Sequence, residues 1–267
     1  MKSLLPAGAP PKPTEPNIPI TGLANLLCGR PTDTGVGKSA LEQLKGSITD
    51  FSTRAVQFLG SDQSVDTTTF GPFCSRVILE NGAAALLGRL DPFRLLYLSE
   101  FQAQPEYVPG KRVRSAFSWA SDVLSDDKPV ANLWDADHDM PKISRSLFSR
   151  HIDHIFWRPA LDRLLDHVSS RSDEALKDVL TIDPEDFIPS TKGKCSQLYS
   201  QLSKGVHWEF FSSALQMDEI TVKTLIRDTF LHLSVLGLAS HFVPTAYASI
   251  RADDAVEEYI AFRGVVP

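Results

Sequence analysis

Residues Glu219 to Val243 read EITVKTLIRDTFLHLSVLGLASHFV, a long and mostly apolar stretch that decides the fold of this chain. Its large apolar side chains recur every three or four residues, which is the spacing that places side chains on one face of an α-helix. They are Val222, Ile226, Phe230, Leu233 and Leu236. Arg227, Asp228 and His232 interrupt the run, so it is too polar for a membrane span. We therefore expect a central helix with an arginine and a histidine in its apolar body. These two side chains either pair with other polar groups or take part in the function of the protein.

The rest of the chain extends this helical pattern. An amphipathic helical stretch at 38–59 is followed by further helical stretches at 72–90 and 194–211, and no convincing alternation of apolar and polar residues predicts a strand. The 267 residues, 42% of them hydrophobic, suffice for a sizeable core. The sequence predicts an all-α fold, an irregular multi-helix bundle that forms one domain over residues 32–267. The proline-bounded segment 181–193 is a candidate hinge within this domain, or else an ordered surface loop.

Residues 1–31 differ from the rest because they contain seven of the 18 prolines. Proline fixes its own backbone and disfavours helix in the residue before it. We therefore expect a Pro-rich N-terminal arm that is extended or disordered and has no core of its own. The first residues lack the apolar stretch of a signal peptide, and no membrane association is expected, so the expected location is the cytoplasm.

Charge and cysteine content argue against several function classes. The net charge of -6 provides no global positive field for nucleic acid, so RNA binding would need a local basic patch. The three cysteines, at positions 28, 74 and 195, match neither a disulfide framework nor a zinc site. The acidic segment 135–139, with His138, matches no metal-ligand spacing either. We expect neither a metal nor a cofactor.

The segment PTDTGVGKSA, residues 31–40, resembles a phosphate-binding loop in which Lys38 would reach the phosphates. Such a loop needs a glycine where this chain has Thr32, and it follows a strand that this sequence does not predict. We therefore expect no ATP binding despite the GVGKS sequence, and we interpret these residues as a helix entry.

A second group of reactive side chains lies in KCSQLYSQLSKGVHWEFF, residues 194–211. Tyr199, Ser203, Lys204 and His207 lie at offsets of four and three residues, so a regular helix would gather them on neighbouring faces. They are candidates for substrate binding. The alternative is that the histidine is hydrogen-bonded to a packing neighbour and has a structural role.

The hexapeptide RDTFLH, from Arg227 to His232, resembles the R-x4-6-H signature of the HEPN superfamily, which comprises helical nucleases and nucleotide-binding proteins. Asp228 fills the polar position after the arginine, and the motif lies on the last long helix, as in that family. The resemblance implies metal-independent cleavage of single-stranded RNA by attack of the ribose 2′-hydroxyl on the adjacent phosphate. His232 would transfer a proton, and Arg227 would stabilise charge on the phosphoryl oxygens. Such an endoribonuclease could serve as a toxin or an antiviral-defence effector.

The spacing of these two residues adds a condition. Five residues at about 100° each place Arg227 and His232 about 140° apart on an ideal helix. They converge only if the helix is irregular or a second copy of the chain completes the site, so the nuclease hypothesis implies a homodimer or another protein partner. The alternative is a non-catalytic helical subunit or scaffold that binds partner proteins. In that case Arg227 would pair with a carboxylate such as Asp228 or Glu219, and His232 would pack in the core.

Overall fold

The computed structural model describes residues 20–31, 36–62, 64–108, 111, 117–124, 145–206 and 217–266. These residues form helices and turns and contain no strand, which confirms the predicted all-α class. The helices are α1 (Gly22–Cys28), α2 (Val36–Gly60), α3 (Ser64–Leu90), α4 (Pro92–Gln102), α6 (Arg150–Ile152), α7 (Arg158–Val168), α8 (Lys177–Leu180), α9 (Phe187–Val206), α10 (Glu219–Ser240) and α11 (Ala252–Val265). Two π-helical turns (Trp119–Leu124 and Asp153–Trp157) and a 3₁₀ turn (Glu174–Leu176) complete the set. Among the helices that the structure describes, none has the length and apolarity that crossing a bilayer requires.

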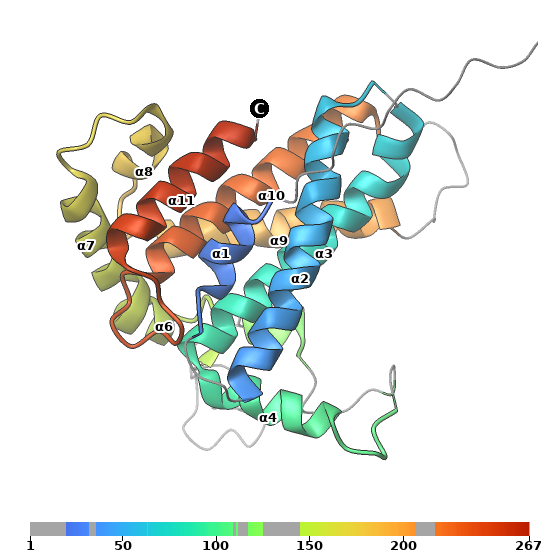
Figure 1. Ribbon diagram of the computed structural model, residues 1–267. Coiled ribbons are helices and arrows are strands. Elements are labelled where there is room, and N and C mark those ends of the chain that lie inside the picture. The colour runs from blue at the N-terminus through green and yellow to red at the C-terminus, as the bar shows by residue number, and fades with distance from the viewer. Residues whose placement is uncertain are drawn as a thin grey trace, which may run out of the picture.

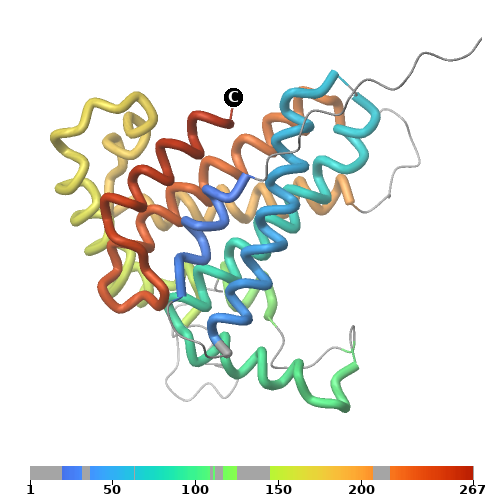
Figure 2. Tube along the Cα trace, viewed as in Figure 1, coloured from blue at the N-terminus to red at the C-terminus, as the bar shows by residue number. Residues whose placement is uncertain are grey.

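Helix α10 lies at the centre of the molecule, as its sequence predicts (Figure 1). Asp218 caps it, because its side chain accepts a hydrogen bond from the backbone N–H of Thr221 at 2.7 Å. The five apolar side chains that predicted a core face are each at most 1% exposed. Helices α1, α3, α9 and α11 pack around it. Figure 2 shows that α1, near the start of the chain, lies beside α10 and α11, near its end.

Glycines set how closely these helices approach. A Cβ atom on Gly82 of α3 would lie 3.1 Å from side-chain atoms of Leu27 and Leu233, which belong to α1 and α10. One on Gly237 of α10 would lie 2.9 Å from the Cβ atom of Leu26. Both distances are shorter than ordinary packing, so α1 can sit against α3 and α10 only because these positions carry no side chain.

The prediction that residues 1–31 form an extended or disordered arm is wrong for the C-terminal part of this segment. Residues 22–28 form α1, whose Leu23, Leu26 and Leu27 are fully buried. The chain is already docked at Ile20, whose backbone N–H donates to Oγ1 of Thr53 at 2.9 Å. The prolines lie before and after the segment GLANLLC, which itself contains none and has leucines at helical spacing. Residues 1–19 lie outside the described part of the chain.

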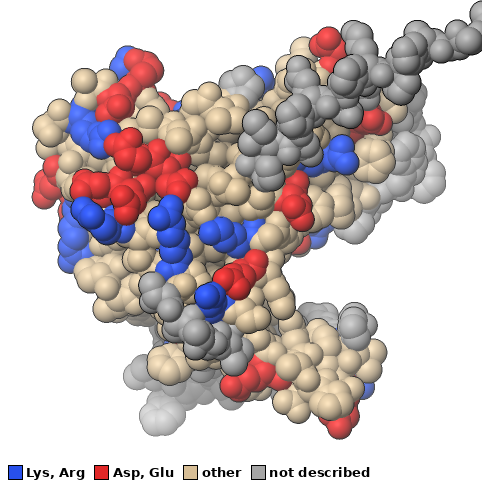
Figure 3. All heavy atoms as spheres, viewed as in Figure 1, with Lys and Arg blue, Asp and Glu red and all other residues tan. Residues whose placement is uncertain are grey.

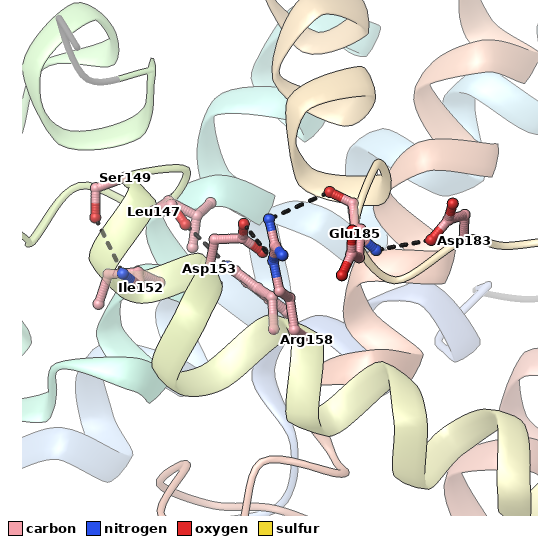
Figure 4. A network of polar contacts seen from close by, with 8 residues as sticks. Leu147, Ser149, Ile152, Asp153, Arg158, Asp183 and Glu185 are labelled. Carbon is pink, nitrogen blue, oxygen red and sulfur yellow. Dashed lines mark hydrogen bonds and ion pairs between the residues drawn. The ribbon is translucent and has the colours of Figure 1, made fainter. Parts of the chain in front are cut away.

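The ordered surface loop that the sequence allows for segment 181–193 is wrong for residues 187–193, which are helical. Residues from Phe187 onward belong to α9, and residues 181–186 form a turn. Arg158 holds this turn, because its Nη2 donates to the carbonyl of Glu185 at 3.3 Å while its Nε pairs with Oδ2 of Asp153 at 3.0 Å (Figure 4). The backbone N–H of Glu185 also donates to Oδ1 of Asp183 at 2.9 Å. These contacts fix the entry to α9.

Arg89, near the end of α3, is a fully buried cation. Each of its five N–H groups has one acceptor, and no acceptor is a carboxylate. The acceptors are the carbonyls of Leu26 and Tyr247, the hydroxyls of Ser240 and Ser249, and Nδ1 of His241. Burial lowers the pKa of Arg89 from 12.5 to about 10, so the guanidinium remains charged at neutral pH. The sequence predicted the buried arginine at Arg227, and the structure places it at Arg89 instead.

The ring of His241 completes this network and is neutral. Its Nδ1 accepts from Nη2 of Arg89 at 3.1 Å and from the backbone N–H of Ile250 at 3.3 Å. The ring proton therefore resides on Nε2, which donates to the carbonyl of Leu26 at 2.9 Å. Burial, together with the charge of Arg89, holds the pKa of His241 well below 6.5.

This environment predicts a pH dependence of stability. The unfolded chain binds a proton at His241 below pH 6.5 and the folded chain resists it, so the free energy of unfolding should fall as the pH decreases through 6.5. The loss should reach about 1.4 kcal/mol per pH unit. Urea unfolding of the wild type and of His241→Gln, on both sides of pH 6.5, measures it. The wild type should lose more stability on acidification than the variant, and equal losses would contradict a neutral buried His241.

Candidate functional site

The three predicted catalytic residues lie on the solvent-facing side of α10. Arg227 is exposed, and Asp228 and His232 are half-buried. The helix is regular from Glu219 to Ser240, so the separation of about 140° expected for Arg227 and His232 holds. The two side chains leave the helix at opposite edges of its exposed strip. One copy of the chain therefore does not bring them onto the same phosphate group.

The environment of His232 favours the neutral imidazole, which is the form that can act as a base. Burial lowers its pKa; the nearby carboxylate of Asp228 opposes this shift, and Lys194 of α9 adds to it. A neutral imidazole with a carboxylate one helical turn away can accept a proton. However, the lining residues of the two cavities described below do not include Arg227, Asp228 or His232.

Two of the four residues predicted on α9 meet through an arginine that the sequence did not single out. Arg76 of α3 donates to Oη of Tyr199 at 2.9 Å and to Oγ of Ser203 at 3.0 Å. Its guanidinium carbon also lies 4.6 Å from the centre of the Tyr199 ring, and its Nε pairs with Oε1 of Glu80 at 3.2 Å. These contacts join α3 to α9. The local signal was the i, i+4 pair of Arg76 and Glu80, but nothing local shows that it faces α9.

The other two residues of that group do not join this cluster. Lys204 is exposed at the end of α9, and His207 lies outside the described residues. The Ser203 hydroxyl also donates to the backbone carbonyl of Tyr199 at 2.6 Å. Both hydroxyls therefore have contacts that hold helices together, and the predicted four-residue substrate site is not assembled by the residues described.

A groove of about 1130 Å³ opens beside Tyr199, and the sequence did not predict it. Helices α2, α3, α4 and α9 line it together with the segment 117–124. Figure 3 shows the surface hollowed where α4 projects from the body of the molecule. Small residues leave its space open, and amide and hydroxyl side chains alternate with leucines and aromatic rings around it. The small residues are Ala40 and Ala84, and the amides are Gln43, Asn81 and Gln102.

One wall of the groove is an aromatic stack. The rings of Trp119 and Tyr199 lie parallel within 7°, with their centres 4.7 Å apart. Trp119 is 7% exposed, and its indole N–H has no hydrogen-bond partner among the residues described. Its π-helical turn is fixed by Asp122, which pairs with Arg94 of α4 and accepts from the backbone N–H of Ser118 at 2.7 Å.

The charges that line the groove are already paired. Among its described lining residues, only Glu80 and Arg94 are charged. Glu80 pairs with Arg76, and Arg94 pairs with the buried Asp122. The groove thus offers no net charge, although Nε of Arg94 has no partner in the described part of the chain.

A smaller cavity of about 490 Å³ lies between α2 and the first half of α3. Phenylalanine rings form most of it, and its charged lining residues are Asp50, Arg54 and Asp66. Two of the rings, Phe51 and Phe73, meet edge to face with their centres 5.8 Å apart. This cavity contains no group of residues that suggests chemistry.

Two further motifs can be located. Gly37 packs against Tyr247, whose hydroxyl would lie 3.1 Å from a Cβ atom at that position, and Lys38 lies 3.9 Å from Oε1 of Glu42. The second glycine of GVGKS, Gly37, therefore has a packing role, and residues 32–35 lie outside the described part. In the same part of the chain, no group of histidine, cysteine, aspartate and glutamate is placed to hold a metal ion, and segment 135–139 falls outside it.

Comparison with known proteins finds no family model, curated protein or solved structure that matches this chain. Two surfaces of the described residues are candidates for function. They are the groove beside α4 and the exposed strip of α10.

Proposed function

We propose that this protein is a non-catalytic helical subunit that binds a polypeptide segment of a partner protein in the groove between α3 and α4. The observation that carries the proposal is the groove itself. Its volume of about 1130 Å³ exceeds the roughly 300–1,000 Å³ of small-molecule pockets. Its described lining residues include no histidine or cysteine, and its two charges are paired. A groove of this size whose two charged side chains are engaged in ion pairs suits binding rather than chemistry.

The character of α4 supports the proposal. None of its residues is buried, and Phe93 and Tyr97 are 79% and 57% exposed. The ring of Tyr97 stacks on Phe101, with their centres 6.4 Å apart, so aromatic side chains continue along the outer side of the helix. Exposed aromatic residues beside a groove are typical of protein-binding surfaces.

A selection from displayed random peptides tests the proposal. Ala84→Trp fills the groove from α3, and Ala261→Trp adds the same side chain to the exposed side of α11 as a matched control. Peptides selected on the wild type should bind Ala261→Trp equally and Ala84→Trp at least about tenfold more weakly. Melting curves of both variants check that each of them is folded. Peptides that bind all three proteins alike, or a selection that enriches none, would contradict the proposal.

A second candidate is the metal-independent endoribonuclease that the HEPN resemblance implies. The observation that favours it is that Arg227, Asp228 and His232 all lie on the solvent-facing side of α10, where burial lowers the pKa of His232. Arg227 and His232 lie about 140° apart around the axis of α10. This candidate therefore requires a second copy of the chain to complete the site. Its activity as a toxin or defence effector would then depend on dimerisation or on a restraining partner.

The nuclease candidate makes a sharp prediction. Arg227→Ala and His232→Ala should each reduce cleavage of single-stranded RNA in the presence of a chelator by about 10²- to 10⁴-fold. Thr224→Ala, on the same exposed strip, is the control and should cleave like the wild type. A wild-type protein that does not cleave RNA at any concentration, or variants that cleave as fast as the wild type, would remove this candidate.

A further inference from the structure

We propose that residues 10–19 of the chain, PPKPTEPNIP, bind as a polyproline II helix to the phenylalanine-lined cavity between α2 and α3. These residues precede the described part of the chain, which begins at Ile20. Among the described residues, this cavity and the groove beside α4 share no lining residue. The site therefore does not depend on the proposed function.

The cavity presents aromatic surface to solvent. Four phenylalanines line it, and two of them, Phe70 and Phe73 of α3, are 53% and 45% exposed. Val65, one turn before Phe70 region of α3, is 77% exposed. Phe51 and Phe58 of α2 form the other wall. A cluster of exposed aromatic side chains at a cavity is typical of a surface that binds another segment of polypeptide.

The described chain begins beside this cavity. The backbone N–H of Ile20 donates to Oγ1 of Thr53 at 2.9 Å, which fixes on α2 the point where the preceding residues arrive. At about 100° per residue, Asp50 lies about 60° around the helix axis from Thr53, and Arg54 lies about 100° in the same direction. Phe58 follows at about 140°. Asp50 and Arg54 are exposed and line the cavity, so an open face of α2 joins Thr53 to it.

The residues before Ile20 have the period of a polyproline II helix. Prolines recur every three positions, at Pro10, Pro13, Pro16 and Pro19. A polyproline II helix has three residues per turn, so these four rings share one edge of it. Helices of this kind dock their proline edge against aromatic side chains. A proline edge that arrives next to a phenylalanine-lined cavity identifies residues 10–19 as its occupant.

The length of the segment fits the path it must cover. A polyproline II helix rises about 3.1 Å per residue, and an α-helix with its side chains is about 10–12 Å wide. About four residues therefore carry the chain from Ile20 across α2. This places Pro16 at the near side of the cavity and Pro13 and Pro10 along it.

The charges of the two surfaces are complementary. The charged lining residues of the cavity are Asp50, Arg54 and Asp66, and the segment contributes Lys12 and Glu15. A lysine and a glutamate can thus each meet an opposite charge on the cavity rim. Such rim pairs orient a bound segment more than they strengthen its binding.

Covalent attachment favours this occupant over a separate molecule. A short tether holds a segment near its site at an effective concentration in the millimolar range. The contact of a few prolines with phenylalanine rings is weak between separate molecules, but within one chain a millimolar affinity suffices. A partner protein would have to displace the segment.

Disulfide formation within the full-length protein tests the proposal. Thr14→Cys, which lies off the proline edge, is combined with Asp66→Cys at the cavity or with Gly264→Cys on α11 as the matched control. Gly264 is exposed, and no described atom lies within 4 Å of its Cβ position. Figure 1 shows α1 between α2 and α11, so a free tether from Ile20 would reach both positions.

The equilibrium with glutathione gives the effective concentration of each cysteine pair. It should be at least about tenfold higher for the Asp66 pair than for the Gly264 pair. The native cysteines do not interfere, because burial raises the pKa of all three thiols and leaves them in the unreactive form.

Two further changes separate docking from mere proximity. Phe70→Glu places a charge in the cavity at an exposed position, and Pro13→Gly with Pro16→Gly leaves the cavity intact but breaks the proline edge. Each should lower the effective concentration of the Asp66 pair to that of the Gly264 pair. Equal values for the two pairs without these changes, or a preference for Asp66 that survives either of them, would overturn the proposal. Disulfide-linked dimers whose yield rises with protein concentration would overturn it in favour of a second copy of the chain.

Discussion

Replacing Arg89 with methionine should lower the free energy of unfolding by about 3 to 5 kcal/mol. Methionine can occupy much of the space of the arginine stem, but it donates no hydrogen bond. The acceptors of the five N–H groups would remain in the core without these five donors. They come from α1, from the end of α10 and from the loop before α11, so the substitution should loosen all three. Urea unfolding at neutral pH measures the loss.

Two further arginine variants make this prediction specific. Arg227→Met removes an exposed arginine from α10 and should change the free energy of unfolding by less than about 1 kcal/mol. Arg89→Lys keeps the charge but offers three donors from a single nitrogen, which cannot reach all five acceptors, so it should also be strongly destabilising. If Arg89→Met is as stable as Arg227→Met, the buried network does not hold these segments together.

Gly29→Ala should be the second severe substitution, with a loss of at least about 2 kcal/mol. Gly29 has a φ angle of 67°, and its Cβ atom would lie 2.0 Å from the carbonyl oxygen of Ala248. That oxygen also accepts the backbone N–H of Arg30 at 2.9 Å, so a side chain at Gly29 would displace the loop before α11. Urea unfolding under the same conditions measures the effect.

Gly46→Ala is the matched control for this substitution. Gly46 lies inside α2, and nothing is within 4 Å of its Cβ position. Alanine there should raise the free energy of unfolding by about 0.5 to 1 kcal/mol, because it restricts the unfolded chain and favours helix. Two substitutions of the same chemistry should thus have opposite signs. If both variants are less stable than the wild type, the lack of space around Gly29 is not the cause of the effect of Gly29→Ala.

The parts of the fold that local spacing determines could be predicted from the sequence. The core face of α10 follows from apolar residues at steps of three and four, and the angle between Arg227 and His232 follows from helix geometry. Helix α1 was missed because its seven residues lie between prolines, and its burial comes from contacts with α2, α10 and α11. Short helices gain most of their stability from such packing.

The buried arginine and the groove could not be predicted in the same way. The acceptors of Arg89 lie 63 to 160 positions away in the chain, so its own neighbours do not distinguish it from Arg227. The proline and the Asp91 cap at the start of α4 mark a new helix, but not the direction in which it projects. The groove depends on that direction and on how Trp119 meets Tyr199.

Hydrogen exchange of α4 in the presence of a selected peptide is the most direct test of the proposed function. None of the α4 residues is buried, so its amides should exchange readily in the free protein through local opening. A segment seated in the groove contacts α4 along Arg94, Leu98 and Gln102 and should slow exchange over Pro92–Gln102. The exposed strip of α10 around Arg227 should exchange as before. Protection confined to α10, or none in α4 at saturating peptide, would contradict a polypeptide-binding groove.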